Sequence, residues 1–579
     1  MMVKTNLLRL AMAWLALTSL LAMAAACGPT PTEAPVTKEA ATEAPAAEAP
    51  ATAVPPTEEP AAEEPAAEEP AAEKPPFVIV ACDTVLSLDP AEDWSFGGGS
   101  GIMIHIYDTL MTFKGEDQSA LVPVLLAEIP SKENGGISED GLTYTMHINP
   151  EARFHDGSPV NAEAVKYSIE RQITLALGPE FYWTSLDHLE VVDEWTLKVV
   201  LQEPSAMFLN LIASPWATRI VNPAVAEANA VDGDMGNAYL YDHDGGSGPY
   251  ILESYEPEFR QITLVRDPNY WGGWSEGTHI DKVIVRWIDE SSTIRSMIEK
   301  GDADAVTCIT YDDWAALDAA EGVRAEAYPG MLLAPIWLSY LNPPFDNILV
   351  RQAMRASLDT ESIIDDVMHG MAFPVEGQAS YVYAGATASE NEVTYDLEQA
   401  KALLEEAGYG DGFEFTCQMP PTFPESQATL EVWQADLAKI GVKMNIQSVD
   451  WATLQANRTG DNIPDCQNGN TSGDFPEAWS LFKYVLHGQA RPRGARWSFY
   501  QNDRVTELIE QIGQTYDPAE RQPLYQEIAD ITAQDVPNIW VFGFKQMVAL
   551  RDNIQGYEYN LALGFQYFPL ETMWREGVD

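Results

Sequence analysis

The stretch YDLEQAKALLEEAGYGDG, residues 395–412, carries the clearest local signal for the fold. Asp396 has the short acidic side chain that caps the first turn of a helix. Apolar residues then recur at helical spacing from Ala400 to Ala407, and Gly408 is the residue type that commonly ends a helix. These features predict a helix over residues 397–407, closed by a glycine turn.

Helices and strands are expected to alternate on both sides of this stretch. Residues 431–440 predict a helix, and residues 442–449 predict the strand that follows it directly. Upstream, alternating apolar residues predict strands at 77–81 and 196–201, and a helix is predicted from Asn161 to Gln172. This mixture favours α/β lobes over a β-sandwich. No period of twenty to fifty residues recurs, which excludes a solenoid.

The amino-terminal residues are typical of an export signal. Lys4 and Arg9 precede an apolar run that ends at Ala26, so residues 1–26 are predicted to be a signal peptide. Cys27 follows three alanines, a position that resembles the lipobox of bacterial lipoproteins. We expect a lipid on Cys27, which would anchor the protein to the outer side of the membrane. A cleaved protein that diffuses freely is the alternative.

Residues 27–76 are predicted to be a disordered tether between this anchor and the body of the chain. The segment repeats proline, alanine and glutamate and contains no aromatic residue. Such a composition cannot bury enough apolar surface to offset the entropy of ordering the chain. Proline and like-charged glutamates both extend it, to on the order of 100 Å at about 3.1 Å per residue.

Charge and motif content exclude several classes of function. The chain has a formal net charge of −55, which repels nucleic acid and anionic membrane surfaces. It contains no GxSxG elbow, Walker loop, GxGxxG fingerprint or HExxH pair. Asp242, Asp244 and Glu253 have the spacing of a calcium loop, but Ser247 stands where the loop requires glycine. We therefore expect no enzyme activity, no cofactor and no metal.

Four cysteines follow Cys27, and their pairing is open. Cys82, Cys308, Cys417 and Cys466 allow three pairings, and none of the spacings is CxxC. The oxidising compartment of an exported protein permits disulfides. We favour a bridge between Cys308 and Cys466, with buried free thiols as the alternative.

Several motifs occur in a fixed order along the body of the chain. They are LDP at 88–90, YDTL at 107–110, RFHDGSPVNAE at 153–163, GSGPY at 246–250, RDPNYW at 266–271, GDADAV at 301–306 and the stretch at 395–412. In this order the chain from Ser87 onward resembles the family 5 solute-binding proteins of ABC transporters, which include oligopeptide-, dipeptide- and nickel-binding proteins.

The resemblance implies a two-lobed α/β periplasmic-binding-protein fold of the class II type, with a subdomain inserted in the first lobe. The expected parts are lobe I at residues 77–112, 239–307 and 539–579, the inserted subdomain at 113–238, and lobe II at 308–538. Chain crossings near Thr307 and Asn538 would form the hinge.

By the same resemblance, the protein is expected to be a receptor that captures a small solute, an oligopeptide, and delivers it to a membrane permease. The permease and ATPase subunits of the importer would be its partners, and the receptor would act as a monomer. Closure of the lobes around ligand would be the signal that the transporter recognises.

The resemblance also indicates a ligand site. Peptide-binding members have a motif GWxxDxxxP whose aspartate pairs with the amino terminus of the ligand. Here that aspartate is Asp474, while Thr471 replaces the tryptophan. A loop aspartate that caps the following helix is the alternative. The aromatic residues expected to line the cleft are Trp94, Phe96, Tyr182, Trp183, Phe475, Trp479 and Trp497.

Three other functions stay open at this stage. Relatives of this fold that bind oligosaccharides place tryptophan faces against sugar rings, so a sugar ligand is one alternative. A ligand sensor coupled to a signalling or folding partner is another. A secreted hydrolase is disfavoured because the nucleophile and metal motifs are missing.

Overall fold

The computed structural model describes residues 74–82, 85–93, 98–115, 120–274, 277–457, 463–488, 498–564 and 567–577. The predicted signal peptide, nearly all of the predicted tether, Cys27, Trp94, Phe96 and Trp497 lie outside the described residues. By its contacts the chain divides into residues 1–71 and 72–579, and everything described below belongs to the second unit.

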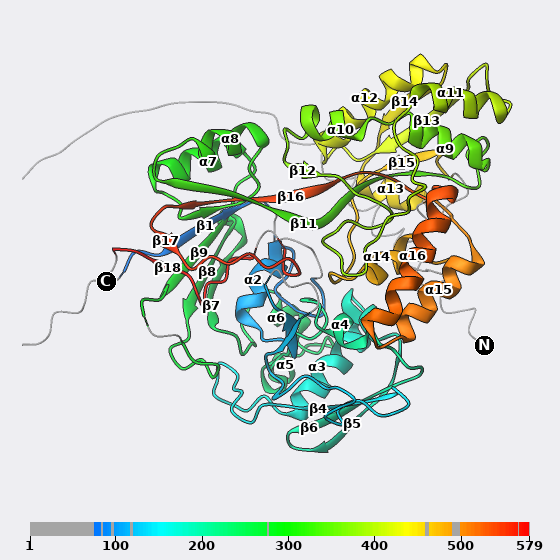
Figure 1. Cartoon of the computed structure of the whole chain (residues 1–579). Coiled ribbons are helices and arrows are strands. Elements are labelled where there is room, and N and C mark those ends of the chain that lie inside the picture. The colour runs from blue at the N-terminus through cyan, green and yellow to red at the C-terminus, as the bar shows by residue number, and fades with distance from the viewer. Residues whose placement is uncertain are drawn as a thin grey trace, which may run out of the picture. The chain divides into compact units, whose positions relative to one another are not determined.

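The main feature of the structure is an eleven-stranded mixed sheet (Figure 1). Its path runs β14-β13-β15-β11-β16-β10-β1-β9-β8-β7, and β12 pairs with β16. The strands are β1 (Phe77–Ala81), β7 (Tyr250–Glu256), β8 (Gln261–Arg266), β9 (Lys282–Trp287), β10 (Ala305–Val306), β11 (Val323–Leu338), β12 (Ala372–Phe373), β13 (Glu414–Met419), β14 (Lys443–Ser448), β15 (Cys466–Asn468) and β16 (Ile539–Arg551).

Lobe I contains β1 and the strands β7 to β10. Its helices and small strands are α2 (Gly98–Ile106), α6 (Asn237–Leu240), η2 (Pro257–Phe259), α7 (Ser291–Lys300), α8 (Tyr311–Asp318), β17 (Ile554–Gln555) and β18 (Trp574–Arg575). Parallel β1 and β9 pair through Phe77 to Ala81, and β1 also runs parallel to β10. Ile79 and Val80 belong to two different clusters of buried apolar side chains. The clusters cover opposite faces of the sheet, because neighbouring residues of a strand face opposite sides.

The inserted subdomain contains a three-stranded sheet of order β4-β6-β5 and a hairpin of β2 and β3. Its elements are β2 (Met111–Phe113), β3 (Leu121–Pro123), β4 (Thr143–His147), α3 (Ala162–Leu175), η1 (Pro179–Trp183), β5 (Leu186–Asp193), β6 (Thr196–Leu201), α4 (Phe208–Ile212) and α5 (Pro223–Ala228). Helix α3 confirms the predicted helix, with Asn161 accepting a hydrogen bond from the amide of Ala164.

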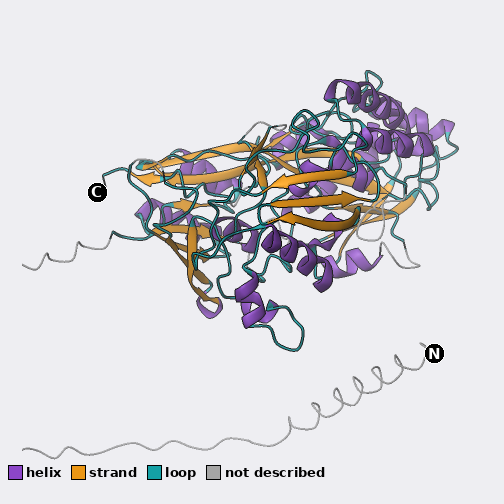
Figure 2. Cartoon of the chain, turned by 90° about the horizontal axis from the view of Figure 1, so that it is seen from below, coloured by secondary structure: helices purple, strands orange, loops and turns teal. Residues whose placement is uncertain are grey.

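Lobe II contains β12 to β15 and most of the longer helices, and Figure 2 shows helices flanking its strands. The helices are α9 (Ile348–Ala356), α10 (Thr360–Ser362), η3 (Ile363–Val367), α11 (Leu397–Glu406), α12 (Pro424–Lys439), α13 (Trp451–Asn457), α14 (Ala478–Val485), α15 (Asp503–Gln514) and α16 (Pro518–Asp535). Helix α11 is capped by Asp396, which accepts from Gln399, as the sequence predicts.

Two long antiparallel strands, β11 and β16, join the two lobes. Val323 to Pro329 of β11 pairs with Arg551 to Lys545 of β16 beside lobe I, and Leu333 to Ile336 pairs with Gly543 to Ile539 beside lobe II. Ile309, ahead of β11, shares a buried cluster with Val80 of lobe I. The chain therefore leaves lobe I within β11, downstream of the expected crossing at Thr307.

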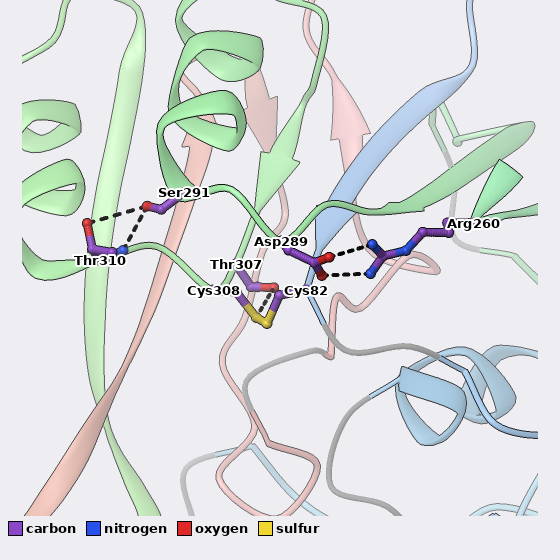
Figure 3. Close-up of a disulfide and its surroundings, with 7 residues drawn as sticks. All are labelled: Cys82, Arg260, Asp289, Ser291, Thr307, Cys308 and Thr310. Atoms are coloured by element: carbon purple, nitrogen blue, oxygen red, sulfur yellow. Dashed lines mark hydrogen bonds and ion pairs between the residues drawn. A yellow bond between two sulfur atoms is a disulfide. The ribbon is translucent and has the colours of Figure 1, made fainter. Parts of the chain in front are cut away.

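The disulfides differ from the expected pairing. Cys82 pairs with Cys308, at a Cα–Cα distance of 5.7 Å (Figure 3). Cys417 pairs with Cys466, at a Cα–Cα distance of 4.3 Å. The predicted Cys308–Cys466 bridge is wrong because these residues lie in different lobes. Cys82 and Cys308 instead follow the neighbouring parallel strands β1 and β10, and Cys417 faces Cys466 across β13 and β15.

The apolar core between the inserted subdomain and lobe II is shared. One buried cluster joins Val165 and Phe208 of the inserted subdomain with Phe475, Ile509 and Tyr525 of lobe II. The inserted subdomain therefore packs directly against α14, α15 and α16. In the described part of the chain, no helix is both long and apolar enough to cross a membrane.

Candidate functional site

Asp474 lies in the loop between β15 and α14, which we call the anchor loop (residues 469–477). At its start, Thr471 exchanges two backbone hydrogen bonds with Leu333 of β11, at 2.8 and 2.9 Å. Gly473 follows, and a Cβ atom there would come within 2.0 Å of Ser480 Oγ. Sheet pairing and this close approach to α14 together fix the backbone at Asp474.

Two tyrosine hydroxyls meet the carboxylate of Asp474. Tyr182 of η1, in the inserted subdomain, donates to Oδ1 at 3.5 Å, and Tyr484 of α14 donates to Oδ2. Ser214 donates in turn to the hydroxyl of Tyr182 at 3.3 Å. The site is thus assembled from two parts of the molecule that are 292 residues apart in sequence.

The charge of Asp474 lacks a cationic partner among the described residues. Burial raises the pKa of Asp474 to about 6, and hydrogen bonds from Tyr484 and Tyr182 offset only part of that rise. A phenol hydroxyl donates a hydrogen bond but brings no positive charge. An ionised carboxylate in such surroundings favours a cation, and a protonated amine is the common cation that also donates hydrogen bonds.

The capping interpretation of Asp474 is wrong. Helix α14 begins after Glu477, and no side chain caps its first turn. The carboxylate of Asp474 points instead to the two tyrosines. Glu477 itself accepts from Tyr525 at 2.6 Å and lies 3.6 Å from Arg521, so it already has an internal cation.

The other predicted lining residues that are described take part in internal packing. Trp183 donates from Nε1 to Gln172 Oε1 at 2.9 Å. Trp479 donates to the carbonyl of Ile509 at 2.8 Å, and its ring stacks on Phe475 with centroids 6.2 Å apart. Of the five described candidates, Asp474 and Tyr182 therefore meet, whereas Trp183, Phe475 and Trp479 support the cores around them.

Sequence reasoning missed two tyrosines of the site, Tyr484 and Tyr383. Tyr484 is ten residues beyond Asp474, on the helix that the anchor loop feeds, so its place on that helix was a usable signal. Tyr383 accepts a hydrogen bond from the amide of Gly473 at 2.9 Å. Nothing in the sequence links Tyr383 to the anchor loop, because the two segments meet only in the folded chain.

The inserted subdomain and lobe II touch at other points as well. The amide of Ala206 donates to the carbonyl of Gly513 at 2.8 Å, and the hydroxyls of Tyr144 and Tyr516 are 3.2 Å apart. The ammonium of Lys132 lies 4.2 Å from the centre of the Tyr516 ring. These contacts join the inserted subdomain to lobe II along α15 and the segment that follows it.

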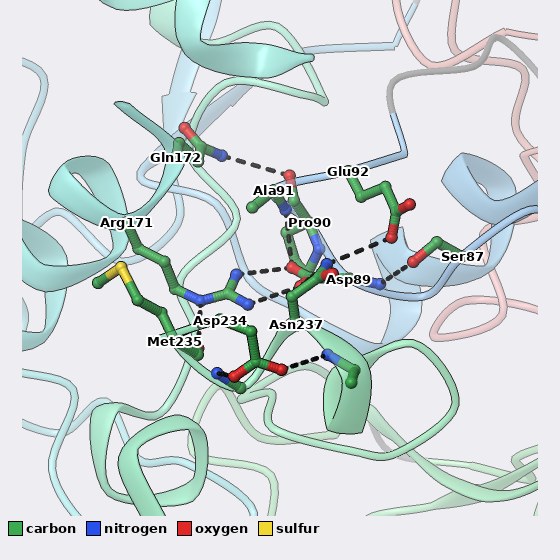
Figure 4. A network of polar contacts seen from close by, with 12 residues as sticks. Ser87, Asp89, Pro90, Ala91, Glu92, Arg171, Gln172, Asp234, Met235 and Asn237 are labelled. Atoms are coloured by element: carbon green, nitrogen blue, oxygen red, sulfur yellow. Dashed lines mark hydrogen bonds and ion pairs between the residues drawn. The ribbon is translucent and has the colours of Figure 1, made fainter. Parts of the chain in front are cut away.

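Another aspartate, Asp89, is fully buried and has different partners. Arg171 of α3 grips it with two hydrogen bonds of 2.6 Å, and Asn237 donates to it at 2.8 Å (Figure 4). Arg171 also donates to the carbonyl of Met235 at 2.9 Å. This network ties the loop after β1 to the inserted subdomain, which is a structural role.

No group of three or more potential ligands among the described residues could hold a metal ion. The calcium-like spacing at Asp242 and Asp244 instead belongs to a turn, in which Asp244 accepts from His155 Nδ1 at 2.7 Å.

Comparison with known proteins gives a consistent set of relatives. The family model of bacterial extracellular solute-binding proteins, family 5 (middle region), matches residues 120–492. The probable D,D-dipeptide-binding periplasmic protein DdpA of Escherichia coli K12 is 27% identical over 495 residues, covering 84% of this chain and 92% of that protein. The glutathione-binding protein GsiB of Salmonella typhimurium is 28% identical over 443 residues, covering 74% and 83%.

The fold is also shared with a solved structure. The periplasmic binding protein DppA from Helicobacter pylori, in complex with the peptide STSA, superposes with a TM-score of 0.72 at 23% identity. The match covers 86% of this chain and 98% of that chain. The two-lobed α/β architecture expected from the sequence is thereby confirmed.

Proposed function

The chain belongs to the bacterial extracellular solute-binding proteins of family 5, and from that premise we propose that it is the peptide receptor of an ABC importer. It captures a peptide between its two lobes outside the cytoplasm and delivers it, chemically unchanged, to a membrane permease. ATP hydrolysis on separate ATPase subunits supplies the energy, since the chain has no Walker loop.

The surroundings of Asp474 carry this proposal. Its carboxylate receives two tyrosine hydroxyls and no cation from the described residues. A peptide amino terminus is protonated at neutral pH and has three N–H donors, so it supplies both the missing charge and further hydrogen bonds. A buried ion pair is favourable only when its remaining polar atoms are also satisfied, and the tyrosines serve that purpose.

The relatives support a peptide ligand. DdpA and GsiB are named for a D,D-dipeptide and for glutathione, and DppA was solved with a bound peptide. A sugar ligand has less support from the described residues, because sugar rings pack on exposed tryptophan faces, whereas Trp183 is buried and the Trp479 ring stacks on Phe475.

The hinge in this proposal consists of β11 and β16. Strand β16 pairs with β10 of lobe I and with β12 of lobe II, and β11 pairs with β16 along its length and with β15 of lobe II. The ladder between β11 and β16 is irregular at Pro329 to Leu333. Bending there would separate the inserted subdomain from α15 and α16, which breaks the contact between Tyr182 and Asp474. The described arrangement thus corresponds to the closed form, with lobe I and the inserted subdomain moving as one body.

The amino-terminal part of the proposal concerns attachment. A lipid on Cys27 would hold the receptor at the membrane surface, and the tether at residues 27–76 would let the lobes reach the permease. The receptor then needs no second copy of itself, and we propose that it acts as a monomer.

A thermal-shift screen of the mature protein tests the proposal. Peptides of two to five residues are compared with cello- and xylo-oligosaccharides of matching size. A ligand present at a hundredfold its Kd adds about 2.7 kcal/mol to the free energy of unfolding. Stabilisation by peptides alone supports the proposal, whereas stabilisation by the sugars alone would replace it with a sugar receptor.

A further inference from the structure

The ladder between β11 and β16 contains a bulge. Pro329 pairs with Lys545 and Leu333 pairs with Gly543, so β11 advances four residues while β16 advances two. A bulge leaves backbone groups without their partners in the ladder, and such groups must be satisfied elsewhere when they are buried. We call residues 330–332 the hinge bulge.

One phenol connects the hinge bulge to the anchor loop. The hydroxyl of Tyr383 donates to the carbonyl of Met331, in the bulge, at 2.6 Å. The same oxygen accepts from the amide of Gly473, next to Asp474, at 2.9 Å. Tyr383 is 1% exposed, so water does not compete for either bond.

The backbone around this phenol reinforces the connection. Leu333, at the end of the bulge, exchanges two hydrogen bonds with Thr471. On the other side of the anchor loop, the amide of Ala384 donates to the carbonyl of Pro476 at 3.0 Å, and Ala478 donates to the carbonyl of Ala384 at 2.9 Å. The anchor loop is therefore held between β11 and the segment that carries Tyr383.

We propose that Tyr383 is a positioning residue that couples the ligand anchor to the hinge, so that a ligand bound at Asp474 alters the hinge bulge through the phenol. This inference rests on the proposed function in so far as it takes Asp474 to be the ligand anchor. A displacement of Gly473 moves the hydroxyl oxygen of Tyr383, which accepts from its amide. The carbonyl of Met331 must then move with the hydroxyl, or the hydrogen bond between them breaks.

The variant Tyr383→Phe isolates this connection. It keeps the ring and nearly all of the volume, so the core remains filled. It leaves the Met331 carbonyl and the Gly473 amide without their partner, in a region where an unsatisfied group is costly. Tyr500→Phe is the matched control, because Tyr500 is a buried lobe II tyrosine whose hydroxyl donates to Asp535 at 2.6 Å rather than to the hinge bulge or the anchor loop.

Hydrogen exchange of the ligand-free mature protein is the first test. In Tyr383→Phe we expect faster exchange both at residues 329–333 and at residues 471–475, with no change at either segment in Tyr500→Phe. Unchanged exchange at either segment in Tyr383→Phe would overturn the inference. This result does not depend on the identity of the ligand.

Exchange with a peptide probe is the second test. The probe is an equimolar pool of alanine peptides of two to five residues at millimolar concentration. In the wild type we expect the peptide pool to change the rate of hydrogen exchange at residues 329–333. In Tyr383→Phe we expect the pool to slow exchange at residues 471–475 but to leave the rate at residues 329–333 unchanged. A full response of residues 329–333 in Tyr383→Phe would overturn the inference.

Affinity and pH dependence distinguish positioning from plain loss of structure. Tyr383→Phe should bind the pool about tenfold more weakly. As the pH is lowered, the affinity of Tyr383→Phe should begin to fall at a lower pH than the affinity of the wild type. The reason is that a looser anchor loop admits water to Asp474, which lowers the pKa of that carboxyl. An unchanged pH midpoint would contradict a positioning role. If the wild type binds no peptide, the proposed function fails, and the ligand-free exchange experiment still decides the inference.

Discussion

Two aspartates of this protein, Asp89 and Asp474, occupy shielded positions but differ in their source of positive charge. Asp89 is fully buried and accepts hydrogen bonds from both terminal nitrogens of the Arg171 guanidinium, each at 2.6 Å. Among the described residues, Asp474 receives two phenol hydroxyls, from Tyr182 and Tyr484, and no cation. A carboxylate paired with a cation of the same chain, such as Asp89, holds the fold together. A carboxylate without such a partner, such as Asp474, can pair with the cation of a ligand.

The comparison also explains why the two sites are built differently. Asp89 joins segments that must stay together, the loop after β1 and helix α3, and a bidentate pair resists separation. Asp474 lies between the inserted subdomain and lobe II, which must separate to admit a ligand. The hydrogen bond from Tyr182 breaks there at lower cost than a desolvated ion pair would.

The largest expected effect comes from removing the internal cation. Arg171→Ala leaves Asp89 buried and uncompensated, and we expect a loss of about 3–5 kcal/mol in the free energy of unfolding. Urea denaturation followed by fluorescence measures it. The matched control is Arg260→Ala, which removes an exposed pair with Asp289 and should leave stability nearly unchanged. Equal losses in the two variants would contradict the structural role of the Asp89 pair.

The next effect comes from neutralising the anchor. Asp474→Asn should weaken peptide binding about 100-fold, because the ligand ammonium loses its counter-charge while the shape of the site is kept. Titration calorimetry measures this change. An affinity equal to that of the wild type would remove Asp474 from the site.

The same variant should raise the stability of the ligand-free protein at pH 7. Because burial raises the pKa of Asp474 to about 6 in the folded state, the ionised carboxylate opposes folding above that pH. Asparagine removes this cost, so the melting temperature measured by calorimetry without ligand should increase. A clear decrease would contradict the view that Asp474 lacks an internal partner.

A smaller effect is expected from pH. Asp474 takes up a proton as the pH falls through about 6, so peptide affinity should be constant between pH 6.5 and 7.5 and should drop about tenfold per unit well below 6. In Asp474→Asn the affinity should be nearly independent of pH over this range. A wild-type affinity that stays level down to pH 5 would argue against the anchor.

The smallest effect concerns the hydroxyl that closes over the anchor. Tyr182→Phe removes one hydrogen bond to Asp474 and leaves the ring in place, so affinity should fall about three- to tenfold. Tyr144→Phe serves as the control, since Tyr144 also lies between the inserted subdomain and lobe II but bonds to Ser205 and Tyr516 instead. Calorimetry on both variants should show the larger loss for Tyr182→Phe.

Much of the local structure could be predicted from the sequence, because the signals are local. Asn161 and Asp396 cap α3 and α11 as expected, since a cap needs only a side chain and an amide two or three residues further on. The two-lobed fold followed from the order of the motifs. The predicted helix at 431–440 is the second part of α12, which begins earlier, at Pro424.

The remaining features depend on which segments meet in space. The disulfide pairing follows from strand neighbours, and the sequence does not state that β10 lies beside β1 or that β15 lies beside β13. Tyr182 and Trp183 are adjacent in η1, yet one reaches Asp474 and the other Gln172. A short helix turns neighbouring side chains to different sides, so composition alone cannot tell a site residue from a core residue.

The central claim, that Asp474 recognises the charged amino terminus of a peptide, is tested most directly by titration calorimetry of the mature protein at pH 7. A peptide that binds is compared with the same peptide acetylated at its amino terminus. The account predicts that acetylation weakens binding about 100-fold in the wild type and has little effect in Asp474→Asn. Equal binding of the free and acetylated peptides by the wild type would contradict it.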